Sequence, residues 1–447
     1  MKRILVSLAL LASISDATAG NVPPPARIAS VTANLSLAGL TIPTNFAGFS
    51  YETSDLIGGY LQGTTGVNGS LIGCINLLGS SGVLRIGGAS SDSATPPALT
   101  SGIASNLATF VAGLGASWSV IYGLDLFAND STTAASQAGM LNTALGSKVT
   151  FQFGNESNAY LNSANYTTRW NAYYTAVTAT VPGAPAAAAD IGNFGSDQSY
   201  TSSLTPGIAG LAALTNHWYN PNPMANAYQI VNSPFSYGTA TGFYLNQSYA
   251  GNTPLLMTES NTVSIGGQAG VSDRLASASW FVNSAIILAN ANWKGLYVHN
   301  GVVANVNAYR AFTLNGDNTF TPQPVFYGML AWSKIQGQQT VQTSIGGNAT
   351  VNAIATKGAN GNANFLIANN DVFGPVTVFI DQSSAWSTAT VLQVKSGTGA
   401  GCTDSTATIG GAAIDKSGAW AGASFSIAKG APVVLGPCEM AFVSIQP

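Results

Sequence analysis

Short apolar segments recur eight times within residues 46–335, and stretches of helical character separate most of them. Strands that alternate with helices form a parallel sheet, which is either a closed barrel or an open, doubly wound sheet. Eight strands in roughly 290 residues agree with the (β/α)8 TIM barrel, whose usual size is about 250 residues. We predict the closed barrel, with the open sheet as the alternative, because helices are hard to recognise after the first and fifth strands. The predicted strands are Phe46–Glu52, Val83–Gly87, Trp118–Leu126, Val149–Gly154, Ala188–Ile191, Leu214–Tyr219, Leu255–Glu259 and Gly295–His299, and the clearest predicted helices are Thr133–Leu145, Tyr166–Thr180 and Asp273–Asn290.

The C-terminal region has a different periodicity. Beyond residue 336, short runs in which apolar and polar residues alternate are separated by Gly-rich turns. Alternation with period two is typical of half-buried antiparallel strands, and a β-sandwich needs about 100 residues. We therefore predict an antiparallel β-sandwich domain for residues 336–447. Every second residue from Val31 to Leu37 is also apolar, so residues 20–45 are predicted to add an N-terminal strand to this sandwich.

The first 19 residues have the features of a signal peptide. Lys2 and Arg3 precede a mostly apolar run, and the small residues Ala17 and Ala19 provide a cleavage site. We predict that residues 1–19 are removed and that the protein is secreted, to the extracellular space or the periplasm.

The three cysteines agree with that compartment. Cys402 and Cys438 both lie in the last quarter of the chain and are predicted to form a disulfide, which an oxidising environment permits. Cys74 lies in an apolar segment and is predicted to be a buried free thiol. There is no CxxC motif or Cys/His cluster in the sequence, so we expect no metal site.

Charged residues make up 7% of the chain, and the net charge is −3. A protein that binds nucleic acid through phosphates needs a basic patch, so that class of partner is excluded. The longest later apolar stretch, Trp280–Leu296, is interrupted by asparagines and falls short of the roughly 20 residues that a membrane span requires. The Gly-rich segments lack the spacing of phosphate-binding loops, so no nucleotide cofactor is predicted. We expect a monomer whose partner is a carbohydrate.

Glutamate occurs at four positions only, and histidine at two. Glu52, Glu156 and Glu259 lie at or just beyond the ends of predicted strands, and so do His217 and His299. The C-terminal ends of barrel strands meet on one face, where the active sites of these barrels lie. Scattered structural residues would instead occupy solvated helices and loops. The placement therefore predicts one site on this face.

Two converging carboxylates without metal ligands or a nucleophile–histidine pair indicate glycoside hydrolysis. A serine hydrolase of the α/β type would need a Gly-x-Ser-x-Gly elbow, which this chain lacks.

The Asn155-Glu156 pair after the fourth predicted strand and Glu259 at the end of the seventh resemble the catalytic positions of clan A glycoside hydrolases. The surrounding segments resemble, more narrowly, glycoside hydrolase family 79, which contains β-glucuronidases and heparanases. That family also has a barrel and a sandwich built from both chain ends. The similar segments, within residues 46–330, are Phe46–Glu52, Leu84–Gly88, Ser90–Asp92, Gly154–Glu156, Thr258–Asn261, Gly270–Asp273 and Phe326–Gly328.

The resemblance implies that Glu156 is the acid/base and Glu259 the nucleophile of a retaining mechanism, with their carboxyl groups about 5–5.5 Å apart. Asn155 would then hydrogen-bond the sugar 2-hydroxyl. Arg85 is expected to point into the barrel and pair with a carboxylate. The other polar residues at strand ends are expected to bind substrate, with packed structural roles as the alternative for the histidines and the tyrosine: Glu52, Asp92, His217, Tyr219 and His299.

One position departs from the family pattern. The family's β-glucuronidases typically have a tyrosine five residues after the nucleophile, where this chain has Ser264, whereas the tyrosine that follows the eighth strand is kept as Tyr309. The leading hypothesis is an exo-acting β-glucuronidase for terminal glucuronate or 4-O-methylglucuronate. The alternatives are a clan A β-glycosidase for a neutral sugar such as glucose, and a non-catalytic carbohydrate-binding protein.

Overall fold

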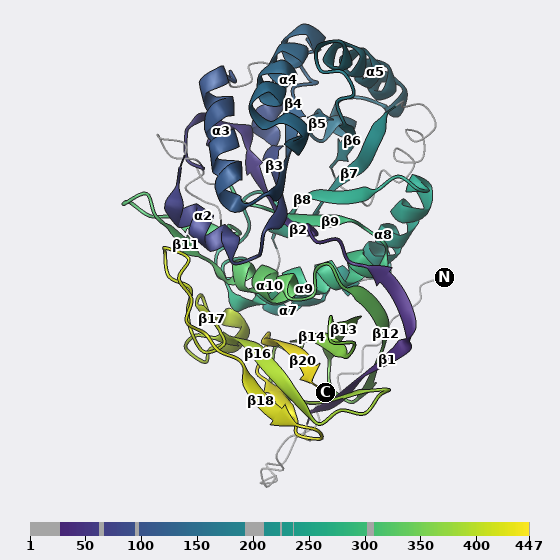
Figure 1. Ribbon diagram of the computed structural model, residues 1–447, viewed down its shortest axis with the longest axis vertical. Helices are drawn as coiled ribbons and strands as arrows, with labels where there is room; N and C mark the ends of the chain where they lie inside the picture. The colour runs from purple at the N-terminus through teal and green to yellow at the C-terminus, as the bar shows by residue number, and fades with distance from the viewer. Residues whose placement is uncertain are drawn as a thin grey trace, which may run out of the picture.

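The computed structural model describes residues 27–61, 67–93, 98–192, 210–223, 226–235, 237–301 and 308–446. These residues form a barrel, at the top of Figure 1, and a separate curved sheet below it. The predicted signal peptide lies outside the described residues.

Among the described residues, eight strands close into a barrel in which each strand runs parallel to its neighbours. They are the eight strands predicted from the sequence, in the same order, so the closed barrel is confirmed and the open sheet is excluded. The bounds are β2 (Ala47–Glu52), β3 (Ser81–Gly87), β4 (Ser117–Leu124), β5 (Val149–Phe153), β6 (Ala186–Ile191), β7 (Leu211–Asn220), β8 (Leu255–Val263) and β9 (Gly295–His299).

Amphipathic helices cover the barrel, and several begin at a side-chain cap. Thr100, Asp130 and Asn162 each accept a hydrogen bond from a backbone N–H of the first turn, as N-cap residues do. The helices are α1 (Thr53–Ile57), α2 (Gly69–Asn76), α3 (Ser101–Leu114), α4 (Ser131–Leu145), α5 (Ser163–Thr180), α7 (Ala227–Asn232), α8 (Tyr237–Ala250), α9 (Leu275–Asn290) and α10 (Pro324–Ser333). Short 3₁₀ helices are η1 (Ala89–Ser91), η2 (Gly146–Lys148), η3 (Ser157–Ala159), η4 (Ser233–Phe235) and η5 (Gly401–Thr403).

The helices that the sequence left unclear follow β2 and β6. After β2 the chain forms the short helices α1 and α2, whose few turns give only a weak periodic pattern. After β6, residues 193–209 lie outside the described residues. α7, α9 and α10 lie between the barrel and the sheet (Figure 1), and α9 is buried on nearly all sides for this reason. This burial explains the long apolar run that the sequence shows there.

The C-terminal strands and β1 form one sheet of ten described strands, antiparallel except where β1 pairs with β15. The antiparallel domain predicted for this region is confirmed, and its strands are connected by hydrogen bonds in a single path. The sheet curls until its ends meet, since Gln393 Nε2 on β16 donates to the Val434 carbonyl on β19 at 2.6 Å. The path is β17 (Ala407–Ile409), β16 (Thr388–Ser396), β20 (Met440–Gln446), β14 (Ala363–Asn369), β13 (Val351–Lys357), β12 (Gln339–Gly347), β1 (Ile28–Thr41), β15 (Val376–Gln382) and β19 (Val433–Leu435), with β18 (Phe425–Ala428) paired to β16. A separate hairpin joins β10 (Phe312–Leu314) to β11 (Phe320–Pro322).

β1 joins the sheet as the sequence predicted, but its alternation stops early. Ala29, Val31 and Ala33 are buried in the core of the sheet, whereas Leu37 is 51% exposed. The pairing register between β1 and β12 shifts between Asn34 and Ala38, and a shift of this kind turns the following side chains to the other face.

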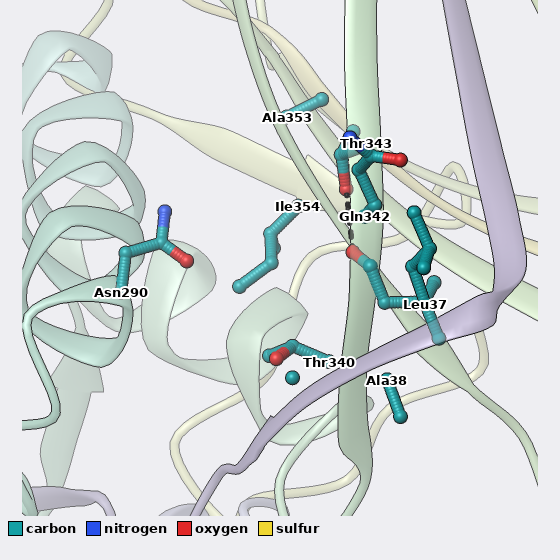
Figure 2. Close-up of a pocket in the computed structure, with 10 residues that line it drawn as sticks. Leu37, Ala38, Asn290, Thr340, Gln342, Thr343, Ala353 and Ile354 are labelled. Atoms are coloured by element: carbon teal, nitrogen blue, oxygen red, sulfur yellow. Dashed lines mark hydrogen bonds between the residues drawn. The ribbon is translucent and has the colours of Figure 1, made fainter.

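Cys402 and Cys438 form a disulfide within the sheet region, and Cys74 is a buried free thiol. None of the described helices has the length and apolar character needed to cross a bilayer. A pocket of about 440 Å³ between β1, β12 and the end of α9 is lined by uncharged residues that include Leu37, Asn290 and Thr340 (Figure 2).

Candidate active site

The C-terminal ends of the barrel strands bring together the ionisable residues that the sequence singled out. Glu52 and His299 end β2 and β9, and Glu156 follows β5. His217 lies in the last part of β7, and Glu259 lies at the middle of β8, which continues four residues beyond it to Val263. The pairing of β8 with β7 skips one residue, because Asn216 and His217 pair with Met257 and Glu259. A bulge of this kind re-aims a side chain, and here it lies directly before Glu259.

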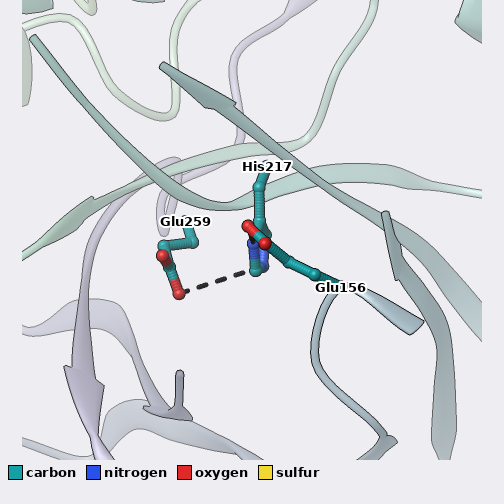
Figure 3. Close-up of side chains that lie close together, drawn as sticks. All are labelled: Glu156, His217 and Glu259. Atoms are coloured by element: carbon teal, nitrogen blue, oxygen red, sulfur yellow. Dashed lines mark hydrogen bonds and ion pairs between the residues drawn. The ribbon is translucent and has the colours of Figure 1, made fainter. Parts of the chain in front are cut away.

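The two proposed catalytic glutamates face each other. One carboxylate oxygen of Glu156, one of Glu259 and a ring nitrogen of His217 all lie within 4.8 Å of one another (Figure 3). Glu156 adopts a left-handed backbone conformation with φ of 46°, which its N–H stabilises by donating to the Asp190 carbonyl at 2.8 Å. A Cβ at Gly192 would lie 2.6 Å from Glu156 Cδ, so a larger residue at this position would displace the Glu156 carboxylate.

The Glu259 carboxylate is held ionised. Arg85 Nη1 donates to its Oε2 at 2.5 Å, and the Tyr219 hydroxyl donates to its Oε1 at 2.8 Å. Burial raises the pKa of Glu259, but His299, His217 and Arg85 together outweigh burial and hold that pKa well below its ordinary value. The hydrogen bond from Tyr219 also stabilises the charged form of Glu259.

Arg85 is fully buried inside the barrel and makes five side-chain contacts. As expected, it pairs with a carboxylate, and it contacts two of them: Glu259 and Asp190. Its remaining hydrogen bonds are to the side chains of Ser50, Gln152 and Asn155, at 3.1, 3.2 and 2.8 Å. A guanidinium with this many acceptors is fixed in one orientation.

His217 lies between two carboxylates. Its Nδ1 is 3.0 Å from Glu156 Oε1, and its Nε2 is 2.6 Å from Asp190 Oδ1. Burial lowers the pKa of His217, but Asp190 and Glu259 outweigh burial and raise it to about 10. The imidazole is therefore doubly protonated and positively charged at neutral pH.

Sequence reasoning missed Asp190. This residue lies near the end of β6, within the apolar run Ala186–Ile191, and its side chain is fully buried. Burial raises its pKa, but Arg85 and His217 outweigh burial, so that the pKa of Asp190 lies below its ordinary value. One signal was available: a single carboxylate inside a predicted buried strand of a chain that has few charges.

Glu52 and Asp92 differ in the hydrogen bonds that they form within the protein. Glu52 Oε2 accepts hydrogen bonds from the N–H and hydroxyl of Ser90, and its Oε1 lies 3.6 Å from His299 Nε2. Both oxygens of Asp92 accept hydrogen bonds within the protein, from the N–H groups of Leu126, Phe127 and Asn155 and from the Tyr160 hydroxyl.

These contacts favour a role for Asp92 in holding the turn after β4 and the backbone of Asn155. The neighbouring Asp125 agrees with this interpretation, because burial and its contact with Asp92 raise its pKa to about 7. Direct contact between a sugar and Glu52, Asp92 or Asn155 stays a prediction.

Tyr309 and Ser264 lie on the same side of the site. The Tyr309 ring stacks on Tyr219 at 6.0 Å between centroids and meets His299 edge-on at 5.9 Å. The turn that begins at Ser264 packs against Tyr309, since a Cβ at Gly267 would lie 2.9 Å from Tyr309 Cβ. Nothing in the sequence singles out Ile265 in this turn, although its φ is 56° and the residue is 88% exposed.

Glu156, His217 and Glu259 are close enough together to hold a metal ion. In this structure, however, the nitrogens of His217 both face carboxylates, and Glu259 is paired with Arg85. A doubly protonated imidazole has no lone pair to offer a metal, so the donor set fits an ion-pair network better. The prediction that the protein needs no metal is not tested by this geometry.

The structure combines a closed (β/α)8 barrel, a sheet built from both ends of the chain and two carboxylates on the C-terminal face of the barrel, where the active sites of such barrels lie. No family model matches the sequence, and no curated protein matches it either. The similarity to particular proteins comes from solved structures.

Three of these structures illustrate the fold. The 4-O-α-L-rhamnosyl-β-D-glucuronidase of Fusarium oxysporum 12S is 16% identical, with a TM-score of 0.74 over 92% of this chain and 100% of that one. The α-L-arabinofuranosidase of Thermotoga maritima is 11% identical, with a TM-score of 0.71 over 94% and 100%. The catalytic domain of the family 30 xylanase C of Talaromyces cellulolyticus is 14% identical, with a TM-score of 0.58 over 94% and 100%. At these identities the similarity shows the fold alone, and the resemblance to family 79 stays a prediction.

Proposed function

We propose that this protein is a secreted, retaining β-glycosidase in which Glu259 is the nucleophile and Glu156 the acid/base. The observation that carries the proposal is the approach of the two carboxylates to within 4.8 Å at the C-terminal end of the barrel. Retaining glycosidases place these groups about 5–5.5 Å apart, whereas inverting enzymes leave about 6.5–9.5 Å for a water molecule.

The different surroundings of the two glutamates support the assigned roles. The Glu259 side chain is 11% exposed and carries the hydrogen bonds and ion pairs of an ionised carboxylate, which a nucleophile must be before it attacks the anomeric carbon. The Glu156 side chain is 43% exposed, so it can reach both the leaving group and the water that enters later. In the first step Glu156 protonates the glycosidic oxygen, and in the second it accepts a proton from water.

For the sugar, we propose terminal glucuronate or its 4-O-methyl form. The Tyr309 ring lies against both Tyr219 and His299, which lie beside the proposed nucleophile, and we propose that its hydroxyl binds the uronate carboxylate. A neutral sugar such as glucose is the second candidate. Ser264 favours it, because serine replaces the tyrosine that glucuronidases of the resembled family have at this position.

A non-catalytic carbohydrate-binding protein is the least supported alternative. Such a protein has no need of a buried arginine, a charged histidine and a tyrosine that together keep Glu259 ionised. Replacement of a buried set of ions by apolar residues is often neutral or stabilising, so stability alone does not explain this set.

The first test replaces the two glutamates and measures turnover of a panel of p-nitrophenyl β-glycosides. We expect Glu259→Gln to lower kcat by roughly 10⁴-fold or more, as loss of a catalytic group does. Glu156→Ala should keep activity only on substrates with good leaving groups, and added azide should then give a β-glycosyl azide. The matched control is Glu439→Gln in the sheet, where the carboxylate accepts hydrogen bonds from the N–H groups of Ser396 and Gly436. Wild-type kcat in Glu259→Gln would contradict the proposal, and an α-glycosyl azide would show inversion.

A further inference from the structure

Asp190 contacts the site through both its side chain and its backbone. Its Oδ2 pairs with Arg85 Nη2, and its Oδ1 lies 2.6 Å from His217 Nε2 and accepts a hydrogen bond from the Thr258 hydroxyl at 2.6 Å. Its N–H donates to the Thr215 hydroxyl at 2.9 Å, and its carbonyl accepts from the N–H of Glu156. All of its polar groups are therefore directed at the proposed catalytic residues or at the residues that hold them.

The two cations that Asp190 contacts reach the proposed catalytic carboxylates: Arg85 reaches Glu259, and His217 reaches Glu156 and also lies 4.0 Å from Glu259. Arg85 uses Nη2 for Asp190 and Nη1 for Glu259. His217 uses Nε2 for Asp190 and Nδ1 for Glu156. Asp190 is therefore linked to Glu259 through Arg85 and to Glu156 through His217.

The charges of the buried groups balance only when Asp190 is included. Arg85 and His217 carry two positive charges, and Glu259 supplies one negative charge among the groups packed around them. The other ionisable groups near His217 are Glu156, next to its Nδ1, and, through Glu259, Tyr219 and His299. Without Asp190, one buried cation would lack a buried counter-ion, and an uncompensated buried charge is strongly unfavourable.

We infer that Asp190 is a positioning residue that keeps His217 charged and directed at Glu156 while it orients Arg85 toward Glu259. The part of this inference that concerns catalysis rests on the proposed function, and the part that concerns the charge of His217 does not. Asp190 need not touch the substrate, because it acts through the two cations.

The effect of Asp190 on His217 has a definite sign. An opposite charge in contact with an imidazole favours its protonated form, so the pKa rises, here to about 10. Wild-type His217 therefore stays charged well above pH 7. When an uncharged amide replaces Asp190, the nearest negative charge is lost while burial and Glu259 remain, so the pKa of His217 falls toward the ordinary working range. Neutral His217 can then take a proton from Glu156 instead of donating a hydrogen bond to it.

NMR tests the charge without requiring activity. The sequence contains two histidines, so protein labelled with ¹⁵N-histidine and purified without a histidine tag gives two imidazoles, which a His299→Gln variant assigns. We expect both ring nitrogens of wild-type His217 to stay protonated through pH 8, and His217 in Asp190→Asn to lose its proton about two pH units lower or more. Loss of a proton from wild-type His217 between pH 6 and 7 would overturn the inference.

The pH profile of kcat/KM tests the effect on catalysis. In Asp190→Asn we expect the alkaline limb to shift by about one pH unit or more, because His217 then loses its positive charge beside Glu156 within the measured pH range and the two groups titrate as a coupled pair. The matched control is Asp404→Asn, which neutralises a buried aspartate in the sheet that Ser396, Thr398 and Thr406 hold by hydrogen bonds. Asp404→Asn should keep the wild-type limbs even where it lowers stability.

The two measurements separate the inference from the proposed function. A chain that hydrolyses no glycoside but keeps His217 charged would contradict the proposed function and support the effect of Asp190 on His217. An active enzyme whose Asp190→Asn variant folds and keeps the wild-type pH profile would contradict the positioning role of Asp190.

Discussion

The barrel and the sheet handle buried charge in opposite ways. Residues 46–335 of the sequence contain all 16 tyrosines and both histidines of the chain, and the carboxylates buried at the barrel site, Asp190 and Glu259, are paired with cations. The sheet region, residues 336–447, has no tyrosine or histidine, and its buried Asp404 is surrounded by N–H and hydroxyl groups.

The difference indicates the role of buried carboxylates in each region. A carboxylate that accepts hydrogen bonds from the backbone stabilises a local turn and needs no cation. A set of paired buried ions is held in one geometry. Its stability depends on every ion in the set, because removal of one ion leaves the charge of another buried and unpaired. The first arrangement is structural, and the second is typical of a site in which charge must be placed accurately.

The largest expected effect is on the free energy of unfolding, when the arginine that pairs with an aspartate is replaced in each of the two regions. Arg85→Ala should lower the free energy of unfolding by about 3–5 kcal/mol, because it leaves two carboxylates buried and unpaired. Arg27→Ala, which breaks the pair with Asp371 at the edge of the sheet, should lower it by less than about 1 kcal/mol, since the Arg27 side chain is 33% exposed. Urea denaturation followed by fluorescence measures both values. Equal losses in the two variants would show that the barrel network is no more interdependent than a surface ion pair.

A smaller effect is expected from the disulfide, and it should be confined to stability. Cys402 and Cys438 are 36 residues apart in sequence, and a cross-link over a loop of this length contributes about 2–4 kcal/mol. The double variant Cys402→Ser/Cys438→Ser should unfold at lower urea concentration and keep its kcat at temperatures where it stays folded. A change in kcat in the folded variant would show that the sheet influences the site. Cys74→Ser is the control, because Cys74 is a buried thiol outside the disulfide.

The smallest expected effect is on substrate binding. If the Tyr309 hydroxyl binds a uronate carboxylate, Tyr309→Phe should raise KM for a p-nitrophenyl glucuronide by about tenfold, or about 1.4 kcal/mol, and hardly change KM for the glucoside. Tyr327→Phe is the matched control, because its hydroxyl accepts a hydrogen bond from the N–H of Ile414 where the barrel meets the sheet. Equal losses on both sugars would mean that Tyr309 is structural. A wild-type preference for the glucoside would favour the neutral sugar.

The sequence was enough to predict the architecture because the strong signals were local. Each barrel strand is an apolar run bounded by polar residues, and β1 has an alternation that matches the C-terminal strands. The positions of Glu156, Glu259 and His217 could be predicted because the chain contains few ionisable residues and these lie at strand ends. The pairing of Arg85 with a carboxylate followed from its place inside a buried strand.

What could not be predicted depends on which strands become neighbours. Asp190 matters because β7 brings His217 beside it and because Arg85 reaches it from β3. The bulge before Glu259 and the register shift that exposes Leu37 are properties of strand pairs, and neither is visible in one strand alone. The same is true of Asp92, whose partners come from two other loops.

The pairing of β1 with strands from the other end of the chain has a consequence for biosynthesis. Ala29 pairs with Gly347 on β12 and with Val378 on β15, so β1 has no partner until the ribosome has made the whole barrel. At about 5–20 residues per second, the intervening 300 or so residues take roughly 15–60 s. During that interval the nascent chain contains an unpaired segment with an apolar face, and segments of this kind can pair with other chains and aggregate. Export before folding would keep β1 away from such chains, and the sheet would then be the last part of the molecule to form.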